Sequence, residues 1–523
     1  MSTVDSIKAT IANAYTFDGP AFTLGTAMLD GQAIPNTLVR LPLGTLNRHG
    51  LIAGATGTGK TKSLQIVAEQ LSRAGVPTLL MDIKGDLSGL AAPGKDHPKI
   101  KERHDLIGEP YEPFASPVEL LSLSDEPGVK LRATVTEFGP VLFSKILGLN
   151  DTQSGVVAVT FKYCDDKKLP LVDLPDFKQA LQYLTKEGKQ EVEQDYGRIS
   201  AASTGAIMRR LLELEQQGAD RFFGEPSFEI DDLLRTDEHG HGICSIIRLT
   251  DMQDRPKLFS SFMLQLLAEI YATMPERGDA DKPELVIFID EAHLVFEEAS
   301  DALLDQLESI IKLIRSKGVG IIFCTQNPAD LPDDILGQLG MKIQHALRAF
   351  TAKDRKAIKL AAQNFPISEY YDISELLTQM GIGEAFVSVL DAKGRPTELV
   401  HTLLRAPASR MDILSKAEIK ELIACSEIVD KYEERVDRET AHEILKAKLE
   451  RAQSEEEQER LREQKSKAKS TSKRRGAEKS TFEKVVNSTT TRQIGRTVAR
   501  ELTRGLLGVL GIKQTRRRKS SWF

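Results

Sequence analysis

The stretch Gly54-Ala-Thr-Gly-Thr-Gly-Lys60-Thr61 decides the fold that we expect for this chain. It has the spacing of a P-loop, in which a glycine and four further residues precede Gly-Lys-Ser/Thr. Such glycines let backbone N–H groups point inward around a polyphosphate, while the lysine reaches the β- and γ-phosphates and the threonine hydroxyl ligates Mg²⁺. We therefore predict a nucleotide-binding loop made of Gly54, Ala55, Thr56, Gly57, Thr58, Gly59, Lys60, Thr61 and Lys62.

The sequence on both sides of this loop fits a P-loop. A short, mostly apolar run over residues 49–53 predicts a strand that enters the loop. Residues 62–74 carry apolar side chains at helical spacing, and a helix that starts at the loop directs its partial positive charge toward bound phosphates. We predict that Thr61 is a Mg²⁺ ligand and that Lys60 is catalytic.

A second motif, Leu285-Val-Ile-Phe-Ile-Asp290-Glu291-Ala-His293, lies far downstream. Five consecutive apolar residues predict a strand that is buried on both faces, and the acidic pair follows its carboxyl end, where open α/β sheets bind ligands. We predict that Asp290 holds Mg²⁺, directly or through water, and that Glu291 orients and deprotonates the attacking water.

A polar residue follows another apolar run. Thr325 and Gln326 follow residues 319–324, which we expect to form a strand beside that of Asp290. A glutamine in this place can sense the γ-phosphate, so we predict that Gln326 is catalytic. The alternative is a turn residue that precedes Asn-Pro.

Composition points to a globular protein. The chain has 523 residues, 41% of them hydrophobic, which allows two to four domains with a sizeable core. Residues 1–22 lack the pattern of a signal peptide, and no apolar run approaches the length of about 18 residues that a membrane helix needs. We expect a cytoplasmic protein without transmembrane segments. The four cysteines are dispersed, which predicts neither a zinc site nor a disulfide framework.

The alternation of strand-like and helix-like segments predicts an α/β fold with a mostly parallel sheet. The expected core is interrupted by about 150 residues with helical periodicity, which indicate an inserted helical subdomain. We predict a small β-type element over 1–47, a nucleotide-binding core over 48–90 and 241–410, a helical insertion over 91–240, a charged helical segment over 411–464, and a basic linker with an amphipathic helix over 465–523.

Charge is distributed unevenly along the chain. Residues 465–523 hold 17 Lys and Arg against three Asp and Glu, so the net charge of −6 combines +14 there with −20 in the preceding residues. Within this tail, residues 491–512 are basic and amphipathic. Such a segment can dock on DNA phosphates, on a protein partner or on a membrane surface, or it can be a solvated tail; we favour DNA or a protein.

The segment Asp82-Ile-Lys84-Gly85-Asp86 follows a predicted strand over 76–81 and raises a second possibility for the nucleotide. Asp82 to Gly85 fits the Asp-x-x-Gly pattern of GTPases. The guanine-reading sequence Asn-Lys-x-Asp is absent, however, and Glu291 favours water activation by a carboxylate. We therefore expect ATP rather than GTP.

Taken together, these blocks resemble the HerA/FtsK-type hexameric ATPases, in the branch of bacterial HerA-like proteins. The resemblance covers about residues 41–407. It implies a RecA-like core, hexameric rings with ATP and Mg²⁺ bound between neighbours, and translocation of DNA driven by ATP hydrolysis. The blocks that carry it are Gly54–Thr61, Asp82–Asp86, Asp290–His293, Arg315–Gly320 and Thr325–Pro328.

The resemblance also implies roles for arginines. Arg48, just before the first core strand, and Arg315, in the stretch Arg-Ser-Lys-Gly, match arginines of the family that act on the nucleotide of a neighbouring subunit. Both are therefore predicted to be catalytic, and Arg348 and Arg355 are further candidates. Only about 45 residues precede the core, where the family's motors usually carry a small β-barrel, so docking of a nuclease partner is not implied here.

Two functions remain open on the sequence. The first is a DNA translocase or helicase powered by ATP hydrolysis. The second is an assembly factor, in which ATP organises an oligomer or holds a protein partner and turnover is slow. Stimulation of hydrolysis by DNA would distinguish them.

Overall fold

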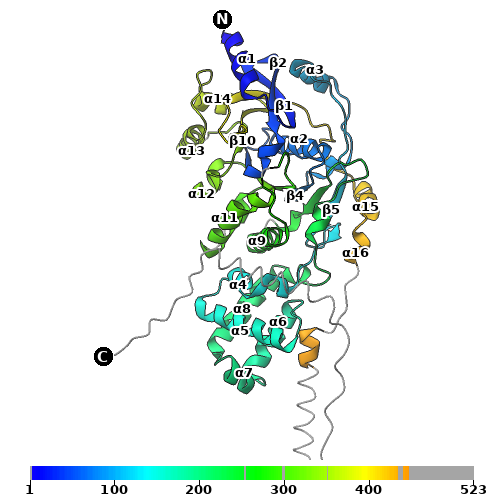
Figure 1. Ribbon diagram of the computed structural model, residues 1–523, viewed down its shortest axis with the longest axis vertical. Coiled ribbons are helices and arrows are strands. Elements are labelled where there is room, and N and C mark those ends of the chain that lie inside the picture. Colours follow the sequence, from blue (N-terminus) through cyan, green and yellow to red (C-terminus); the bar gives the residue numbers. More distant parts are fainter. Residues whose placement is uncertain are drawn as a thin grey trace, which may run out of the picture. The chain divides into compact units, whose positions relative to one another are not determined.

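The computed structural model describes residues 3–252, 255–278, 280–296, 301–349, 351–433 and 440–446 (Figure 1). The chain divides into two compact units, one formed by residues 1–132 and 226–434, the other by residues 133–225 and 435–523. The predicted basic linker and amphipathic helix of 465–523 lie outside the described residues.

The first unit contains a sheet of twelve strands in the order β2-β1-β12-β11-β10-β3-β9-β8-β4-β7-β5-β6. The eight strands from β10 to β6 run parallel, whereas β2, β1, β12 and β11 pair antiparallel. The predicted α/β class with a mostly parallel sheet is confirmed. The strands are β1 (Ala21–Leu29), β2 (Gln32–Pro42), β3 (Gly50–Ala53), β4 (Thr78–Asp82), β5 (Val118–Ser122), β6 (Val129–Lys130), β7 (Cys244–Arg248), β8 (Leu285–Ile289), β9 (Val319–Thr325), β10 (Met341–Gln344), β11 (Glu384–Ser388) and β12 (Val400–Leu404).

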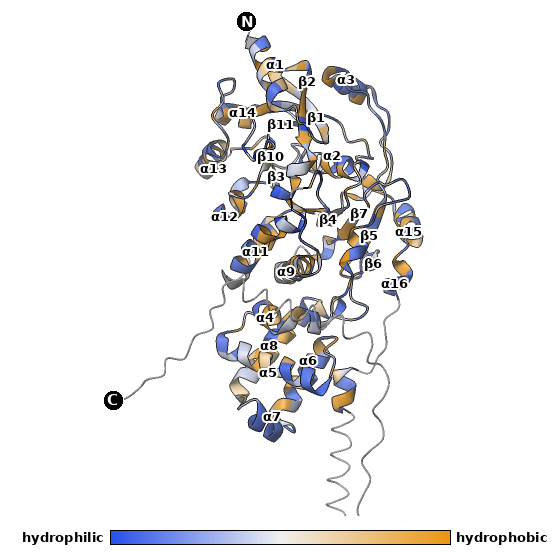
Figure 2. Ribbon diagram, in the orientation of Figure 1, coloured by the Kyte–Doolittle hydropathy of each residue, from blue (hydrophilic) through white to orange (hydrophobic). Residues whose placement is uncertain are grey.

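The central strands are apolar because helices cover both faces of the sheet. Every residue of β8 and β9 is buried, as expected for parallel strands without a solvent face. Figure 2 colours the elements by hydropathy and shows apolar residues in labelled strands of the sheet such as β7. On one face, Leu64, Val67 and Leu71 of α2 (Lys60–Arg73) share a core cluster with residues of β3 and β4.

Other helices complete the first unit. α9 (Pro256–Thr273) packs against α10 (His293–Phe296) and α11 (Asp301–Ile314). No helix among the described residues is both long and apolar enough to cross a membrane. The remaining helices are α1 (Thr3–Ala14), α3 (Pro98–Ile107), α12 (Asp333–Leu336), α13 (Ala352–Gln363), α14 (Ile373–Gln379), α15 (Lys416–Ala424) and α16 (Val429–Glu433), with short 3-10 turns such as η1 (Leu43–Arg48) and η6 (Arg315–Lys317).

The segment 1–47 contains the helix α1 and a hairpin of β1 and β2. The hairpin is not a separate element, because β1 pairs with β12 and so extends the main sheet. Tyr15, at the end of α1, donates from its hydroxyl to the carbonyl oxygens of Val387 at 2.9 Å and Glu398 at 2.8 Å. Burial of Tyr15 and these bonds fasten α1 to β11 and to the turn that follows it.

The second unit is helical and has its own aromatic core. Capping boxes at Thr134, Asn150 and Asp173 start three of its helices. The ring centroids of Phe143 and Phe177 lie 4.9 Å apart, an edge-to-face contact that stabilises such cores. The helices are α4 (Val135–Ile146), α5 (Asp151–Lys167), α6 (Leu174–Thr185), α7 (Lys189–Asp195) and α8 (Ala201–Gln216), and residues 441–446 are also helical.

The boundaries of these units differ from those that we predicted. Within 91–240, the expected helical insertion, α3, β5 and β6 belong to the first unit, because β5 pairs with β7 in the sheet. Within 411–464, α15 and α16 belong to the first unit. Residues 440–446 belong to the second, where the amide of Ala441 donates to the carbonyl oxygen of Pro170 at 3.0 Å.

Candidate active site

The carboxyl ends of neighbouring parallel strands bring most of the predicted site residues to one edge of the sheet. The P-loop follows β3, Asp82 ends β4, Asp290 follows β8 and Gln326 follows β9. Ligands of open α/β sheets bind at this edge. Segments that are far apart in the sequence therefore meet at one edge of the sheet.

The P-loop turns sharply between β3 and α2. Gly54 and Gly59 have φ angles of 154° and 115°, which side chains with a Cβ rarely adopt. A Cβ on Gly54 would lie only 2.5 Å from the Cβ of His345. Lys60 is 7% exposed and donates from Nζ to the carbonyl oxygens of Gly54 at 2.7 Å and Ala55 at 3.3 Å. Its ammonium therefore lies over the loop, in the place of a phosphate-binding lysine.

Asp290 offers a buried carboxylate oxygen that has no hydrogen-bond donor among the described residues. The residue is 5% exposed, and its Oδ2 atom has no hydrogen-bond partner among the described residues. Burial raises the pKa of Asp290 to about 7, against the opposing charge of Lys84. A cation would stabilise such an oxygen, so Asp290 fits the predicted role of a Mg²⁺ ligand. Thr61 lies in the first turn of α2.

Glu291 lies directly after Asp290 with a φ angle of 47°, a left-handed conformation that costs about 1–3 kcal/mol for residues other than glycine. Its carboxylate forms an ion pair with Lys84 Nζ, and Nδ1 of His293 lies 3.3 Å from Oε2. Burial raises the pKa of Glu291, but the hydrogen bond and charge of Lys84, with help from Gln326 and His293, hold it below its ordinary value. Glu291 is therefore ionised at neutral pH.

Gln326 connects the P-loop with Glu291. Its Nε2 atom lies 3.4 Å from Oε2 and 3.5 Å from Oε1 of Glu291, while Thr56 donates from its hydroxyl to Oε1 of Gln326 at 3.3 Å. The structure thus brings together Lys60, Asp290, Glu291 and Gln326. The amide group lies where a γ-phosphate sensor is expected.

The structure does not bring Arg48 or Arg315 to this edge. Arg48 ends η1 before β3, and Arg315 starts η6 before β9, so both lie at the amino ends of their strands. His49, which follows Arg48 in the sequence, accepts at Nδ1 from the amide of Ile321 at 3.0 Å. Burial is the main cause that lowers the pKa of His49 to about 4, and the charge of Arg315 lowers it further. Arg315 is exposed. Neither arginine reaches the P-loop of its own chain.

Comparison with known sequences assigns the family. The chain matches the family model described as helicase HerA-like C-terminal over residues 28–517. The chain belongs to this family. The HerA-like chain is thus a P-loop ATPase, as the resemblance of its motifs implied.

Two curated relatives carry the name DNA double-strand break repair helicase HerA. The one from Sulfolobus acidocaldarius is 20% identical over 371 residues, which are 70% of this chain and 67% of that protein. The one from Sulfurisphaera tokodaii is 23% identical over 374 residues, with the same coverage. Among solved structures, the bacterial conjugative coupling protein TrwB matches with a TM-score of 0.50 at 14% identity, covering 78% of this chain and 94% of that chain. This last likeness concerns the fold.

The HerA-like site contains two residues whose roles we did not predict. Asp82 accepts hydrogen bonds from the backbone amides of Gly85 at 2.7 Å, Asp86 at 3.1 Å and Leu87 at 3.2 Å. Its carboxylate therefore shapes its own turn, and the spacing Asp-x-x-Gly was the signal for this. Lys84, inside that turn, points to Glu291, which no local pattern reveals.

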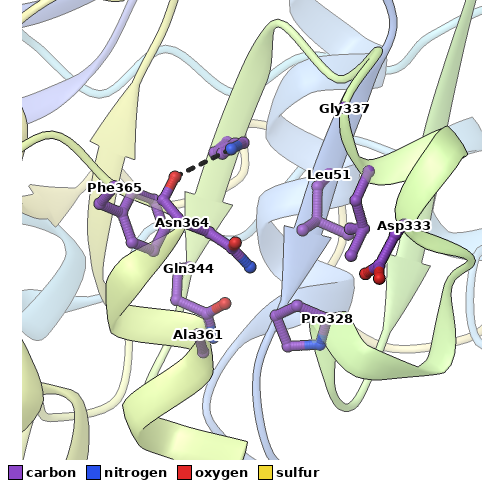
Figure 3. Close-up of a pocket in the computed structure, with 10 residues that line it drawn as sticks. Leu51, Pro328, Asp333, Gly337, Gln344, Ala361, Asn364 and Phe365 are labelled. Atoms are coloured by element: carbon purple, nitrogen blue, oxygen red, sulfur yellow. Dashed lines mark hydrogen bonds between the residues drawn. The ribbon is translucent and has the colours of Figure 1, made fainter.

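A separate cavity of about 300 Å³ lies over β3 and β10, beside α12 and α13 (Figure 3). Lys342 donates from Nζ to the carbonyl oxygen of Asn364 at 3.0 Å at its wall. None of the predicted catalytic residues lines this cavity, so it is distinct from the HerA-like active site. Its lining residues are Leu51, Pro328, Asp333, Leu336, Gly337, Lys342, Gln344, Ala361, Asn364 and Phe365.

Proposed function

We propose that this HerA-like chain hydrolyses Mg²⁺-ATP at the interfaces of a hexameric ring and uses the energy to move along or remodel DNA. One observation carries the proposal. The ionised carboxylate of Glu291 lies in one site with the P-loop lysine Lys60 and with Gln326. The curated relatives are named as DNA repair helicases, which supports DNA as the substrate.

Each site residue has its own role in hydrolysis. The P-loop amides and Lys60 bind the β- and γ-phosphates, and Glu291 takes a proton from the water that attacks the γ-phosphorus. Gln326 donates a hydrogen bond to the γ-phosphate or accepts one from the water. Through this contact the position of the loop after β9 depends on whether the γ-phosphate is bound. Thr61 and Asp290 would hold Mg²⁺, which neutralises negative charge on the phosphate oxygens.

The two arginines act on the nucleotide of a neighbour in this proposal. Arg48 and Arg315 lie at the amino ends of β3 and β9, away from the P-loop of their own chain. A guanidinium can donate two hydrogen bonds to developing negative charge on phosphate oxygens. An arginine finger of this kind contributes about 10³ to 10⁵ in rate.

The basic segment 465–523 supplies a second contact in this proposal, to DNA phosphates or to a protein partner. It lies outside the described residues, so only its charge supports the assignment. Seventeen cationic side chains favour the binding of an anionic polymer, and the affinity of such binding falls as the salt concentration rises.

The first experiment measures steady-state ATP hydrolysis by the full chain with Mg²⁺, in the absence and presence of double-stranded DNA. We expect DNA to stimulate the rate, and we expect Lys60→Ala to abolish hydrolysis because the phosphates lose their lysine. A slow rate that DNA does not change would contradict the motor and favour an assembly factor that acts on a protein.

A further inference from the structure

Glu291 forms an ion pair with Lys84. If Glu291 only activated water, this ion pair would not be needed. Nζ of Lys84 contacts Oε1 of Glu291, whose side chain is buried, so the ammonium occupies an oxygen that the attacking water would have to reach. A carboxylate that holds an ammonium is a weak proton acceptor. For Glu291 to accept a proton from water, the ammonium has to move to another anion.

Lys84 is also connected to the P-loop through neighbouring side chains. Glu291, which Lys84 contacts, lies within 3.5 Å of Nε2 of Gln326, and Gln326 accepts a hydrogen bond from Thr56 of the loop. Although burial opposes it, pairing with Glu291 and the charge of Asp290 hold the pKa of Lys84 above its ordinary value, and the side chain is charged. Two ammonium groups near one unpartnered carboxylate oxygen of Asp290 form a site for a polyphosphate with a cation.

The side chain of Lys84 can move while its backbone stays in place. Its side chain is 37% exposed, whereas that of Glu291 is 6% exposed. The turn around Lys84 is held by the carboxylate of Asp82, which accepts from three backbone amides that follow Lys84. The flexible four-carbon stem of a lysine allows the ammonium to swing from Glu291 toward a neighbouring phosphate.

We propose that Lys84 is a second phosphate-binding lysine, which pairs with Glu291 until the γ-phosphate of ATP takes its ammonium. The transfer frees Glu291 to accept the proton of the attacking water. After hydrolysis and release of phosphate, ADP offers no γ-phosphate, and Lys84 returns to Glu291. Glu291 is thus blocked unless a triphosphate is bound. The inference rests on the proposed hydrolysis of ATP at this site.

The test compares two nucleotides. Equilibrium binding of ADP and of the non-hydrolysable analogue AMP-PNP is measured with Mg²⁺ for the wild-type chain and for Lys84→Ala. We expect the Kd of AMP-PNP to rise roughly tenfold to a hundredfold, the usual loss for a hydrogen bond between charged groups, and the Kd of ADP to stay the same. Equal changes for both nucleotides, or no change for AMP-PNP, would overturn the proposal.

Two further variants exclude a general structural effect. Lys84→Arg keeps a cation and is expected to recover part of the AMP-PNP affinity. Lys282→Ala removes a lysine that donates to the carbonyl oxygens of Ala74 at 3.0 Å and Gly75 at 3.1 Å, beyond the far end of α2. This control is expected to leave both affinities unchanged.

A double-mutant cycle with Glu291→Gln distinguishes binding of the γ-phosphate by Lys84 from simple neutralisation of Glu291 by Lys84. Without the competing carboxylate, AMP-PNP is expected to bind more tightly, and Lys84→Ala is expected to cost more affinity than in the wild-type chain. If Lys84 only neutralises Glu291, Lys84→Ala would cost nothing in this background. Absence of hydrolysis in the wild-type chain would instead contradict the proposed function itself.

Discussion

Glu291 combines a strained backbone with a crowded carboxylate. Its positive φ angle persists because the next amide, that of Ala292, donates to the carbonyl oxygen of Cys324 at 2.9 Å, and the amide of Leu294 donates back to Glu291. Strain of this kind is maintained where it positions a functional group. Here it turns the carboxylate toward Lys84 and Gln326.

We predict that Glu291→Gln slows ATP turnover by at least about 10²-fold, the usual contribution of a positioned general base. The phosphate-binding loop is unchanged, so ATP is expected to remain bound, which nucleotide extraction from the purified protein would reveal. The matched control is Glu284→Gln, because Glu284 pairs at the surface with Nε of Arg277 at 3.3 Å. Normal turnover in Glu291→Gln would refute the catalytic assignment.

The segment that follows β12 forms hydrogen bonds with α2, the helix that begins at the P-loop. Residues 405–414 run along α2, where Lys62 donates from Nζ to the carbonyl oxygen of Met411. The buried carboxylate of Glu69 accepts from the amides of Ala408 at 2.7 Å and Ser409 at 2.9 Å, and from the hydroxyl of Ser409 at 2.9 Å. The helix that presents Lys60 is therefore fixed by a segment more than three hundred residues away.

We predict that Glu69→Ala lowers the free energy of unfolding by about 1–3 kcal/mol, because it leaves buried donors without an acceptor. The thermal midpoint and ATP affinity are both expected to fall. Glu112→Ala is the control. Glu112 is exposed, and its Oε2 atom lies 3.5 Å from Nη1 of Arg73, which like Glu69 belongs to α2. Such surface pairs contribute at most about 1 kcal/mol to stability. An equal loss in both variants would contradict the role of Glu69.

At the scale of the whole molecule, the parallel sheet separates two kinds of predicted catalytic residue. Lys60, Asp290, Glu291 and Gln326 follow the carboxyl ends of strands, whereas Arg315 precedes the amino end of β9. One chain therefore has the proposed phosphate site at one edge of the sheet and an exposed cation, Arg315, at the opposite edge. This arrangement suits a ring in which each site is completed by a neighbour.

We predict that Arg315→Ala abolishes hydrolysis but leaves ATP binding intact. Mixing Arg315→Ala subunits with Lys60→Ala subunits is expected to restore part of the activity, since an intact Arg315 then meets an intact P-loop across some interfaces. Arg395→Ala, which removes an exposed partner of Asp391, serves as the control. Loss of ATP binding in Arg315→Ala, or no activity in the mixture, would contradict action across an interface.

Elements with a local signal could be predicted from the amino-acid sequence. The P-loop depends on the spacing of glycines and Lys60, and β8 was predictable because a parallel strand buried on both faces is a continuous apolar run. The order of these elements also predicted that Asp290 and Gln326 reach the edge where the loop lies, since parallel strands end together.

Features that depend on pairing between distant segments could not be predicted and are visible only in the folded chain. The residues of β1 and β5 do not reveal in the sequence that their partners are β12 and β7. Both strands belong to the main sheet rather than to the separate N-terminal element and helical insertion that we expected. The pairing of Lys84 with Glu291 has the same cause. Periodicity records which face of a segment is buried, but not which remote side chain meets it there, because that contact forms only when the sheet assembles.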